Sequence, residues 1–109
     1  IPPRVRQARE LLARALRSGV TIGCGSDVGV FSHGGSAREL ELMVKYGMDH
    51  AQALRSATTV AANVLRRPDL GRISEGATAD LIAVRGNPLE DISVLRNPTL
   101  VIKDGKVVE

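Results

Sequence analysis

One glycine-rich stretch of the chain carries the residues best suited to chemistry. In TIGCGSDVGVFSHGG, residues 21–35, an apolar run leads into small residues and Asp27, and His33 follows six positions later. A carboxylate in such a place can ligate a divalent metal and can accept a proton from an attacking water. The same stretch could instead form a phosphate-binding loop, or a turn that the Asp27 side chain caps.

The phosphate-binding alternative fits the spacing of the glycines poorly. A dinucleotide-binding loop needs G-x-G-x-x-G directly after a strand, with a helix beginning at once. Gly23 and Gly25 match the first two glycines, but Val28 stands at the third. The next helix is expected only from Ser36, and the stretch contains no lysine of the P-loop type. A metal site and a capped turn are the stronger alternatives.

One helix and one buried strand are expected to position the stretch. Pro2 and Pro3 mark the start of an amphipathic helix that Gly19 ends. Residues 20–24 are short, rich in β-branched side chains and uncharged, which predicts a strand buried on both faces, as in a parallel sheet. Such a strand needs hydrogen-bonding neighbours, yet no other convincing strand precedes residue 80. The chain is therefore expected to be a piece of something larger.

Two helical segments are expected to follow the stretch. Ser36-Ala37-Arg38-Glu39 has the form of a capping box and predicts a helix over residues 36–46. Asp49-His50-Ala51-Gln52 predicts a second cap, which opens an Ala-rich helix. That helix is expected to break near Thr58-Thr59 and to stop before Pro68.

The last third of the sequence predicts short antiparallel strands. Residues 80–84, Asp80 followed by an apolar run, predict a strand. Residues 100–108 predict a hairpin, with Asp104-Gly105 in a type I′ turn. This change of character divides the chain into residues 1–66 and residues 67–109.

The positive charge of the chain is concentrated in the first helix. The 109 residues carry a net charge of +3, and residues 1–19 alone carry five arginines against one glutamate. A basic helix of this kind could bind a nucleic acid or another partner. No aromatic residues interleave the arginines for base stacking, and a solvated outer face is the simpler interpretation. We therefore expect no nucleic-acid partner.

The composition is that of an ordinary globular chain with an aliphatic core. Hydrophobic residues make up 43% of the sequence and charged residues 25%, with only Phe31 and Tyr46 as aromatic residues. A single cysteine, Cys24, excludes an internal disulfide and is typical of a reducing compartment. No run of about 18 apolar residues and no signal peptide is visible. We expect a cytoplasmic chain without a membrane partner.

Two blocks of the sequence resemble the C-terminal part of the amidohydrolase superfamily. Residues 56–65, SATTVAANVL, and residues 70–84, LGRISEGATADLIAV, are similar to AT-x-x-A-A-x-x-L-G…G-x-I-x-x-G-x-x-A-D-L in imidazolonepropionase-like and Xaa-Pro dipeptidase-like members. Gly25-Ser26-Asp27 resembles the motif of the eighth barrel strand, and residues 101–108 resemble the closing V-x-x-G-x-x-V hairpin. The resemblance covers nearly the whole chain.

The resemblance implies an α/β fold: the last part of a (β/α)8 TIM barrel, plus C-terminal strands of a small β-sandwich. Residues 20–24 then correspond to barrel strand eight, flanked by helix seven over 2–18 and helix eight over 36–46. Residues 1–66 correspond to the C-terminal portion of the barrel, and residues 67–109 to the C-terminal part of the sandwich. Because a complete barrel needs about 250 residues, the chain corresponds to less than half of such an enzyme.

The resemblance further implies a metal-dependent hydrolase that acts on C–N bonds of amides or peptide-like substrates, of the dipeptidase or imidazolonepropionase type. Asp27 is implied as a catalytic residue and metal ligand, for one or two divalent ions, expected to be Zn²⁺. In that role its carboxylate shuttles the proton of the nucleophilic water. His33 is implied to line the pocket of a small-molecule substrate.

Most metal ligands of that family have no counterpart in this sequence. The His-x-His pair, the bridging lysine or glutamate and two later histidines are missing, and His50 falls in a helix cap after the predicted strand. We therefore expect the isolated chain to be inactive and to need the rest of the barrel or another chain, in an assembly that could be a homo-oligomer. Two alternatives are a non-catalytic module that binds through its Arg-rich N-terminal helix, and an enzyme whose Gly-rich loop holds a phosphorylated ligand.

Overall fold

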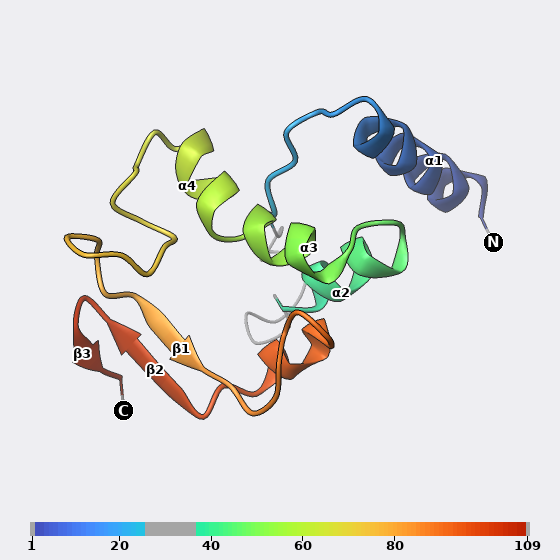
Figure 1. Ribbon diagram of the computed structural model, residues 1–109. Helices are drawn as coiled ribbons and strands as arrows, with labels where there is room; N and C mark the ends of the chain where they lie inside the picture. Colours follow the sequence, from blue (N-terminus) through green and yellow to red (C-terminus); the bar gives the residue numbers. More distant parts are fainter. Residues whose placement is uncertain (1, 26–36, 109) are drawn as a thin grey trace.

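The computed structural model describes residues 2–25 and 37–108, in which helices lead into a small antiparallel sheet (Figure 1). In chain order the elements are α1 (Pro3–Arg17), α2 (Arg38–Lys45), α3 (His50–Ser56), α4 (Thr59–Val64), β1 (Leu81–Ala83), the 3-10 helix η2 (Ile92–Arg96), β2 (Leu100–Lys103) and β3 (Lys106–Val107). None of the helices in these residues combines the length and the apolar character that a membrane span requires.

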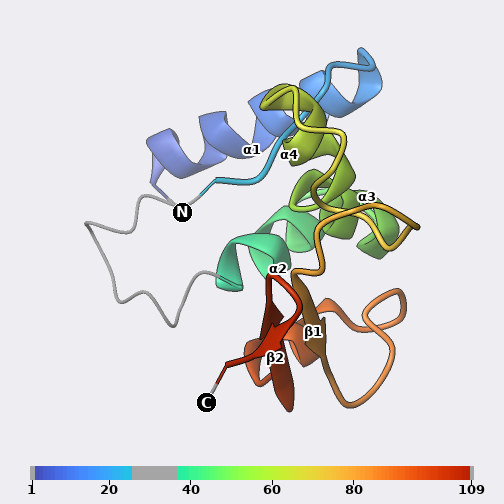
Figure 2. The ribbon, with the colours of Figure 1, turned by 90° about the vertical axis from the view of Figure 1, so that its left-hand side faces the viewer.

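Helix α1 begins and ends where the sequence predicts. Proline stands in its first turn, where the missing N–H has no intrahelical partner to lose. At its end Gly19 has a φ of +73°, and the N–H of Val20 donates to the carbonyl of Ala15 at 3.2 Å. The helix buries no side chain fully, and Leu11 of its apolar stripe is 66% exposed. Figures 1 and 2 both place α1 at the opposite end of the molecule from the sheet.

The core lies where α2, α3 and η2 meet. Its buried side chains are Leu40 of α2, Met48 in the turn before α3, Ala53 of α3 and Ile92 of η2. Leu16, at the end of α1, packs against this group from outside. The core therefore joins segments on both sides of the predicted division at residue 66, a division that stays a prediction.

Helix η2 was not predicted, and contacts with α2 and α3 hold it in place. Arg96 forms a bidentate ion pair with Glu41 of α2, with both N···O distances at 2.6 Å. The N–H of Ile92 donates to Nδ1 of His50, at the start of α3, at 3.2 Å. Only Asp91, whose side chain accepts from the N–H of Ser93, marks the helix locally. Its position is thus determined by residues far away in the sequence.

Helices α3 and α4 confirm the predicted cap and the predicted break. The N–H of Gln52 donates to Oδ1 of Asp49 at 2.7 Å, and the N–H of Asp49 donates to Oε1 of Gln52 at 3.0 Å. These reciprocal bonds form the capping box expected from the sequence. Between the two helices Thr58 has φ −122° and ψ −97°, outside the helical region, so the helix is interrupted there.

Helix α2 is shorter than predicted at both ends. It begins at Arg38 and ends at Lys45, whereas the sequence predicted a helix over residues 36–46. Ala37 occupies the N-cap position and provides no side-chain hydrogen bond, and Ser36 lies outside the described residues. Glu39 and Glu41 in the first turn supply the negative charge that the helix dipole favours at this end.

The strand predicted over residues 20–24 does not form among the described residues. The segment runs from the end of α1 toward α3 without a sheet ladder (Figure 1). A strand is defined by hydrogen bonds to a neighbouring strand. Within the described chain the only strands are β1, β2 and β3, which pair with one another. The sequence likewise contains no convincing strand before residue 80 that could pair with residues 20–24.

The sheet confirms the predicted hairpin and the strand before it. Its order is β1-β2-β3, all antiparallel, with Leu81 opposite Ile102 and Ile102 opposite Val107. In the turn between β2 and β3, Asp104 has φ 50° and Gly105 has φ 80°, the two positive values that a type I′ turn requires. No residue of the three strands is fully buried. The sheet therefore lies outside the helical core.

Candidate functional site

Both predicted site residues, Asp27 and His33, lie outside the described residues, so the site is described here from the two segments that flank it. Cys24 lies near the start of the stretch, among its described residues, and Leu40 belongs to the first helix after it. Leu40 is part of the buried core, and Cys24 packs against that core. Described residues on both sides of Asp27 and His33 therefore belong to the helical core or pack against it.

Cys24 anchors the near side of the stretch. Its N–H donates to the carbonyl of Ser56, at the end of α3, at 2.8 Å. Burial raises the pKa of the Cys24 thiol above its usual value, and the negative charge of Glu39 raises the pKa further. A thiol of this kind stays protonated near neutral pH and is a poor nucleophile and a poor metal ligand. Cys24 is thus a packing residue.

Ser56 is the acceptor of this contact and is 1% exposed. Its hydroxyl donates to the carbonyl of Ala53 at 2.6 Å and lies 3.8 Å from Sδ of Met43. The hydroxyl and the carbonyl of this fully buried serine thus both have partners, as buried polar groups require. The serine is small enough to let residues 20–25 approach α3 closely.

The described residues do not form a metal site by themselves. In residues 2–25 and 37–108, no three His, Cys, Asp or Glu side chains cluster in a way that could hold a metal ion. His50 accepts the N–H of Ile92 through Nδ1, which makes it part of the α3–η2 contact. A catalytic zinc takes three protein ligands. Any metal site that uses Asp27 must therefore draw on further ligands.

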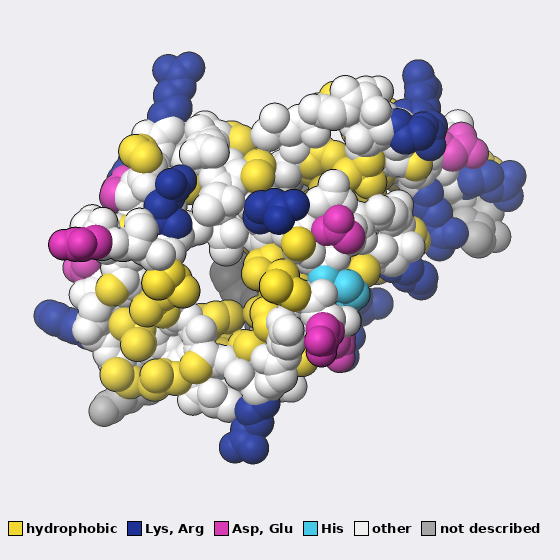
Figure 3. All heavy atoms as spheres, viewed as in Figure 1, with side chains coloured by type: hydrophobic (Ala, Val, Ile, Leu, Met, Phe, Trp, Pro, Cys, Tyr) yellow, Lys and Arg dark blue, Asp and Glu magenta, His cyan; other side chains and the backbone are white. Residues whose placement is uncertain are grey.

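An apolar groove of about 590 Å³ separates the sheet from α2 and α3. Figure 3 shows hydrophobic side chains gathered around this hollow. Its walls include Leu40 and Leu54 on the helical side, and Leu81 and Ile82 on the sheet side. Among the described residues, the lining of the groove contains no cluster of metal-ligating groups.

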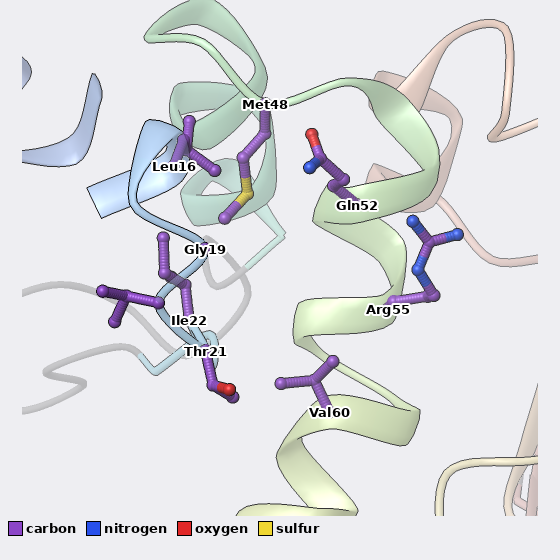
Figure 4. A pocket seen from close by; sticks show the side chains of 9 residues that line it. Leu16, Gly19, Thr21, Ile22, Met48, Gln52, Arg55 and Val60 are labelled. Atoms are coloured by element: carbon purple, nitrogen blue, oxygen red, sulfur yellow. The ribbon is translucent and has the colours of Figure 1, made fainter. Parts of the chain in front are cut away.

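A second pocket, of about 260 Å³, lies between residues 19–22 and the helices α3 and α4. Figure 4 shows Leu16 and Ile22 on one side, with Met48 beside Leu16, and Arg55 and Val60 on the other. Of its polar side chains, Gln52 is already engaged in the capping box. Among the residues that the structure describes, this pocket too has no cluster of metal-ligating groups.

The basic residues of α1 are only partly free for binding. The guanidinium of Arg9 lies 4.4 Å from the ring centroid of Tyr46, at the end of α2, and donates to its hydroxyl at 3.3 Å. This hydrogen bond lowers the pKa of the Tyr46 phenol. One arginine of the helix thus serves to dock α1 on α2 by a cation–π contact.

A comparison with known families decides the class of the protein. Residues 3–108 match the amidohydrolase family. The chain belongs to the amidohydrolase family. This finding confirms the resemblance drawn from the sequence, and it assigns the chain to a family of hydrolases.

Individual relatives agree with this assignment. A crystal structure of a Xaa-Pro dipeptidase with bound methionine is 48% identical and superimposes on 95% of this amidohydrolase chain with a TM-score of 0.89. Ochratoxinase from Aspergillus niger is 39% identical over 85% of the chain. Imidazolonepropionase from Anaeromyxobacter dehalogenans is 38% identical over 60% of it.

The chain spans only part of each relative. It covers 26% of the dipeptidase structure, 20% of ochratoxinase and 16% of imidazolonepropionase. The superposition of the backbones therefore covers about one quarter of an amidohydrolase. The activity of the complete protein is a proposal.

The sequence did not indicate the roles of Ser56 beside residues 20–25 and of Gly71 beside Thr58. In the sequence Ser56 is the first residue of one family block, and Gly71 belongs to the second block. Gly71 has a φ of +73° and lies against the carbonyl of Thr58. The available signal was the glycine itself, since a glycine at a positive φ often permits close backbone approach.

Proposed function

We propose that this chain supplies the last barrel strand, one metal ligand and the C-terminal strands of a small accessory sheet to a metal-dependent amidohydrolase. The supporting observation is the superposition of 95% of the chain on the Xaa-Pro dipeptidase, at a TM-score of 0.89. On this proposal residues 20–24 become a strand when neighbouring barrel strands pair with them. Their lack of a ladder among the described residues then has a simple cause.

Asp27 is the proposed catalytic residue. It follows the proposed strand directly, and carboxyl ends of barrel strands are where such folds place their chemistry. A divalent metal, Zn²⁺ in this proposal, would be held by Asp27 together with imidazoles from outside this chain, and would make the attacking water more acidic. The Asp27 carboxylate would take up the proton of that water and return it to the leaving nitrogen. His33 lines the substrate pocket.

The substrate class is an amide or peptide-like C–N bond. The relative with 48% identity is a Xaa-Pro dipeptidase, which favours a dipeptide over the other family substrates. The chain alone is proposed to be inactive, because its described residues provide no metal cluster. Its partner is the rest of the barrel, in the same polypeptide or in another chain.

A hybrid enzyme tests this proposal. Residues 3–108 replace the matching quarter of the Xaa-Pro dipeptidase, and hydrolysis of Xaa-Pro dipeptides is measured with and without Zn²⁺. We expect metal-dependent turnover in the hybrid and none in the chain alone. Asp27→Asn should lower kcat at least roughly a hundredfold, the scale of a lost acid–base group. His33→Ala should raise KM.

The matched control is Glu75→Gln, which removes one negative charge at an exposed position of the loop before β1. It should leave kcat within about twofold, as expected for a surface substitution away from the site. An Asp27→Asn hybrid with normal kcat and normal zinc content would refute the assignment of Asp27.

A further inference from the structure

Two positive side chains lie close to the ring of Tyr46, where α1 meets the end of α2. The guanidinium of Arg9 is 4.4 Å from the ring centroid, and its Nη2 donates to the phenol oxygen at 3.3 Å. Lys45, the residue before Tyr46, places its ammonium nitrogen 5.8 Å from the same centroid. The ring attracts each cation separately. The result is a cluster, formed by Arg9, Lys45 and Tyr46, that holds two like charges at one site.

No carboxylate of the described residues forms an ion pair with either cation. Glu41 stands four residues before Lys45, the spacing of a helical ion pair, yet both of its carboxylate oxygens accept from Arg96. Glu10 follows Arg9 directly and therefore projects about 100° away from it around α1. The positive charge of the cluster is thus not balanced within the part of the chain that the structure describes.

Arg9 also retains a donor without a partner. Among the described residues, its Nε is buried and makes no hydrogen bond. Burying such a donor costs free energy, because the water that it binds in the unfolded chain is not replaced. The face of the Tyr46 ring attracts the guanidinium charge but offers no strong acceptor to this N–H. The contact between α1 and α2 therefore compensates Arg9 only in part.

The polar groups of the cluster are donors. A guanidinium and an ammonium can only donate, and the Tyr46 oxygen already accepts from Arg9, which leaves its O–H to donate. The hydrogen bond from Arg9 and the charges of Arg9 and Lys45 lower the pKa of the Tyr46 phenol, in keeping with a positive local field. Arg6, exposed and one turn before Arg9 on α1, adds further positive charge. Donors of this kind are complementary to an oxyanion.

We propose that the cluster of Arg9, Lys45 and Tyr46 binds a small oxyanion of the phosphate class, which links α1 to α2. The guanidinium and the phenol O–H supply the hydrogen bonds, and Lys45 supplies the second positive charge. Two cations match a phosphate group, which carries a charge of about −1.5 to −2 near neutral pH, better than the single charge of a carboxylate. The site uses neither Asp27 nor the proposed hydrolase activity.

The fluorescence of Tyr46 provides a specific probe, because the chain contains one tyrosine and no tryptophan. The full chain is titrated with inorganic phosphate at an ionic strength held constant with sodium chloride. We expect a saturable change in fluorescence with a Kd on the order of 1 mM. The midpoint of thermal unfolding should rise with phosphate, because the ligand binds the folded state. Methyl phosphate, titrated in parallel, distinguishes a site open to phosphate esters from one for the free ion.

Three variants are compared by their phosphate affinity. Arg9→Gln removes the charge and the guanidinium fork, and should weaken binding at least roughly tenfold. Lys45→Gln removes a charge near the site and should weaken binding about threefold. The matched control is Arg14→Gln, at an exposed position of the same helix that points about 140° away from Arg9. This control should bind phosphate within about twofold of the unchanged chain.

Lys45→Gln keeps the test open if Arg9→Gln fails to fold, since Lys45 is exposed. In the hybrid enzyme, broadening of the ³¹P resonance of phosphate by the same variants gives a second measurement that does not depend on the chain alone. A phosphate response of equal size in Arg9→Gln, Lys45→Gln and Arg14→Gln would show general screening of charge and would overturn the site. Acetate that binds as tightly as phosphate would overturn the phosphate class.

Discussion

The helical core and the three-stranded sheet differ in how far this chain completes them. In the core, Leu40 and Ala53 are buried and several segments pack on one another. In the sheet no residue is fully buried, and Ile82 is 51% exposed. The comparison teaches that the same sequence encodes one region with buried side chains and another that leaves apolar side chains exposed.

The pattern of the strands explains this difference. An antiparallel sheet with one solvated face alternates apolar and polar residues along each strand. In β1 the neighbours Leu81 and Ile82 are both apolar, and in β2 the neighbours Val101 and Ile102 are too. Apolar side chains therefore lie on both faces of the sheet. Both faces are suited to burial, which agrees with the proposal that the sheet belongs to a larger assembly.

The largest expected difference is between a leucine in the core and a leucine in the sheet. Leu40→Ala should lower the free energy of unfolding by about 2–4 kcal/mol, because it removes buried surface and leaves a cavity. The matched change Leu100→Ala, at a residue that is 39% exposed, should cost less than about 1 kcal/mol in the chain alone. Urea unfolding of both variants measures the difference. Equal costs would show that the sheet is stabilised within this chain.

A charged residue introduced on the sheet should have opposite effects in the chain alone and in the hybrid enzyme. Ile82→Lys should reduce self-association of the chain alone, because it interrupts an exposed apolar surface. In the hybrid enzyme the same change should lower the free energy of unfolding by about 1–3 kcal/mol, if the sheet face is covered there. Sedimentation measures the self-association of the chain alone, and thermal unfolding measures the stability of the hybrid enzyme. A hybrid insensitive to the lysine would mean that this face stays open.

A smaller effect is expected from the cap of α3, which belongs to the core. Asp49→Ala removes the side-chain acceptor of the capping box and should lower the free energy of unfolding by about 1 kcal/mol. Asp49→Ser should recover most of this loss, since serine is also a good N-cap residue. Denaturant unfolding separates the two variants, and equal stability of alanine and serine would argue against the cap.

The smallest effect concerns pH and helix η2. Hydrogen bonds from Ser93 hold the pKa of the Asp91 carboxyl below its usual value. Because the folded pKa is lowered, this stabilisation is present above the unfolded pKa of about 4 and is lost as pH falls through the folded pKa. Protection of the η2 amides from exchange, relative to the intrinsic exchange rate at each pH, should therefore fall below about pH 4. Asp91→Asn should make that protection nearly independent of pH, and a retained pH dependence would assign it to another group.

Sequence predicted those elements whose signals are local. The capping box of Asp49 and Gln52 and the Asp104-Gly105 turn each depend on residues within a few positions of one another, and both are confirmed. Helix η2 was not foreseen, because distant partners such as Glu41 hold it in place. The strand over residues 20–24 could not form for a related reason, since its ladder needs neighbours that the described chain does not provide.

In the candidate site too, features that depend on local sequence were predictable, and contacts between distant residues were not. The family was predictable from two blocks of sequence, and residues 3–108 confirm it. The roles of Asp27 and His33 came from the resemblance and stay proposals. The contact between Cys24 and Ser56 joins residues that lie far apart in the sequence, and no pattern within either segment indicates it.

The most direct measurement is a crystal structure of the hybrid enzyme grown with Zn²⁺. Our account predicts a carboxylate oxygen of Asp27 about 2.0–2.2 Å from the metal, the distance typical of carboxylate–zinc bonds. It also predicts that residues 20–24 pair with a neighbouring barrel strand. A zinc ion bound by other residues, with the Asp27 carboxylate capping a turn of its own loop, would contradict the account.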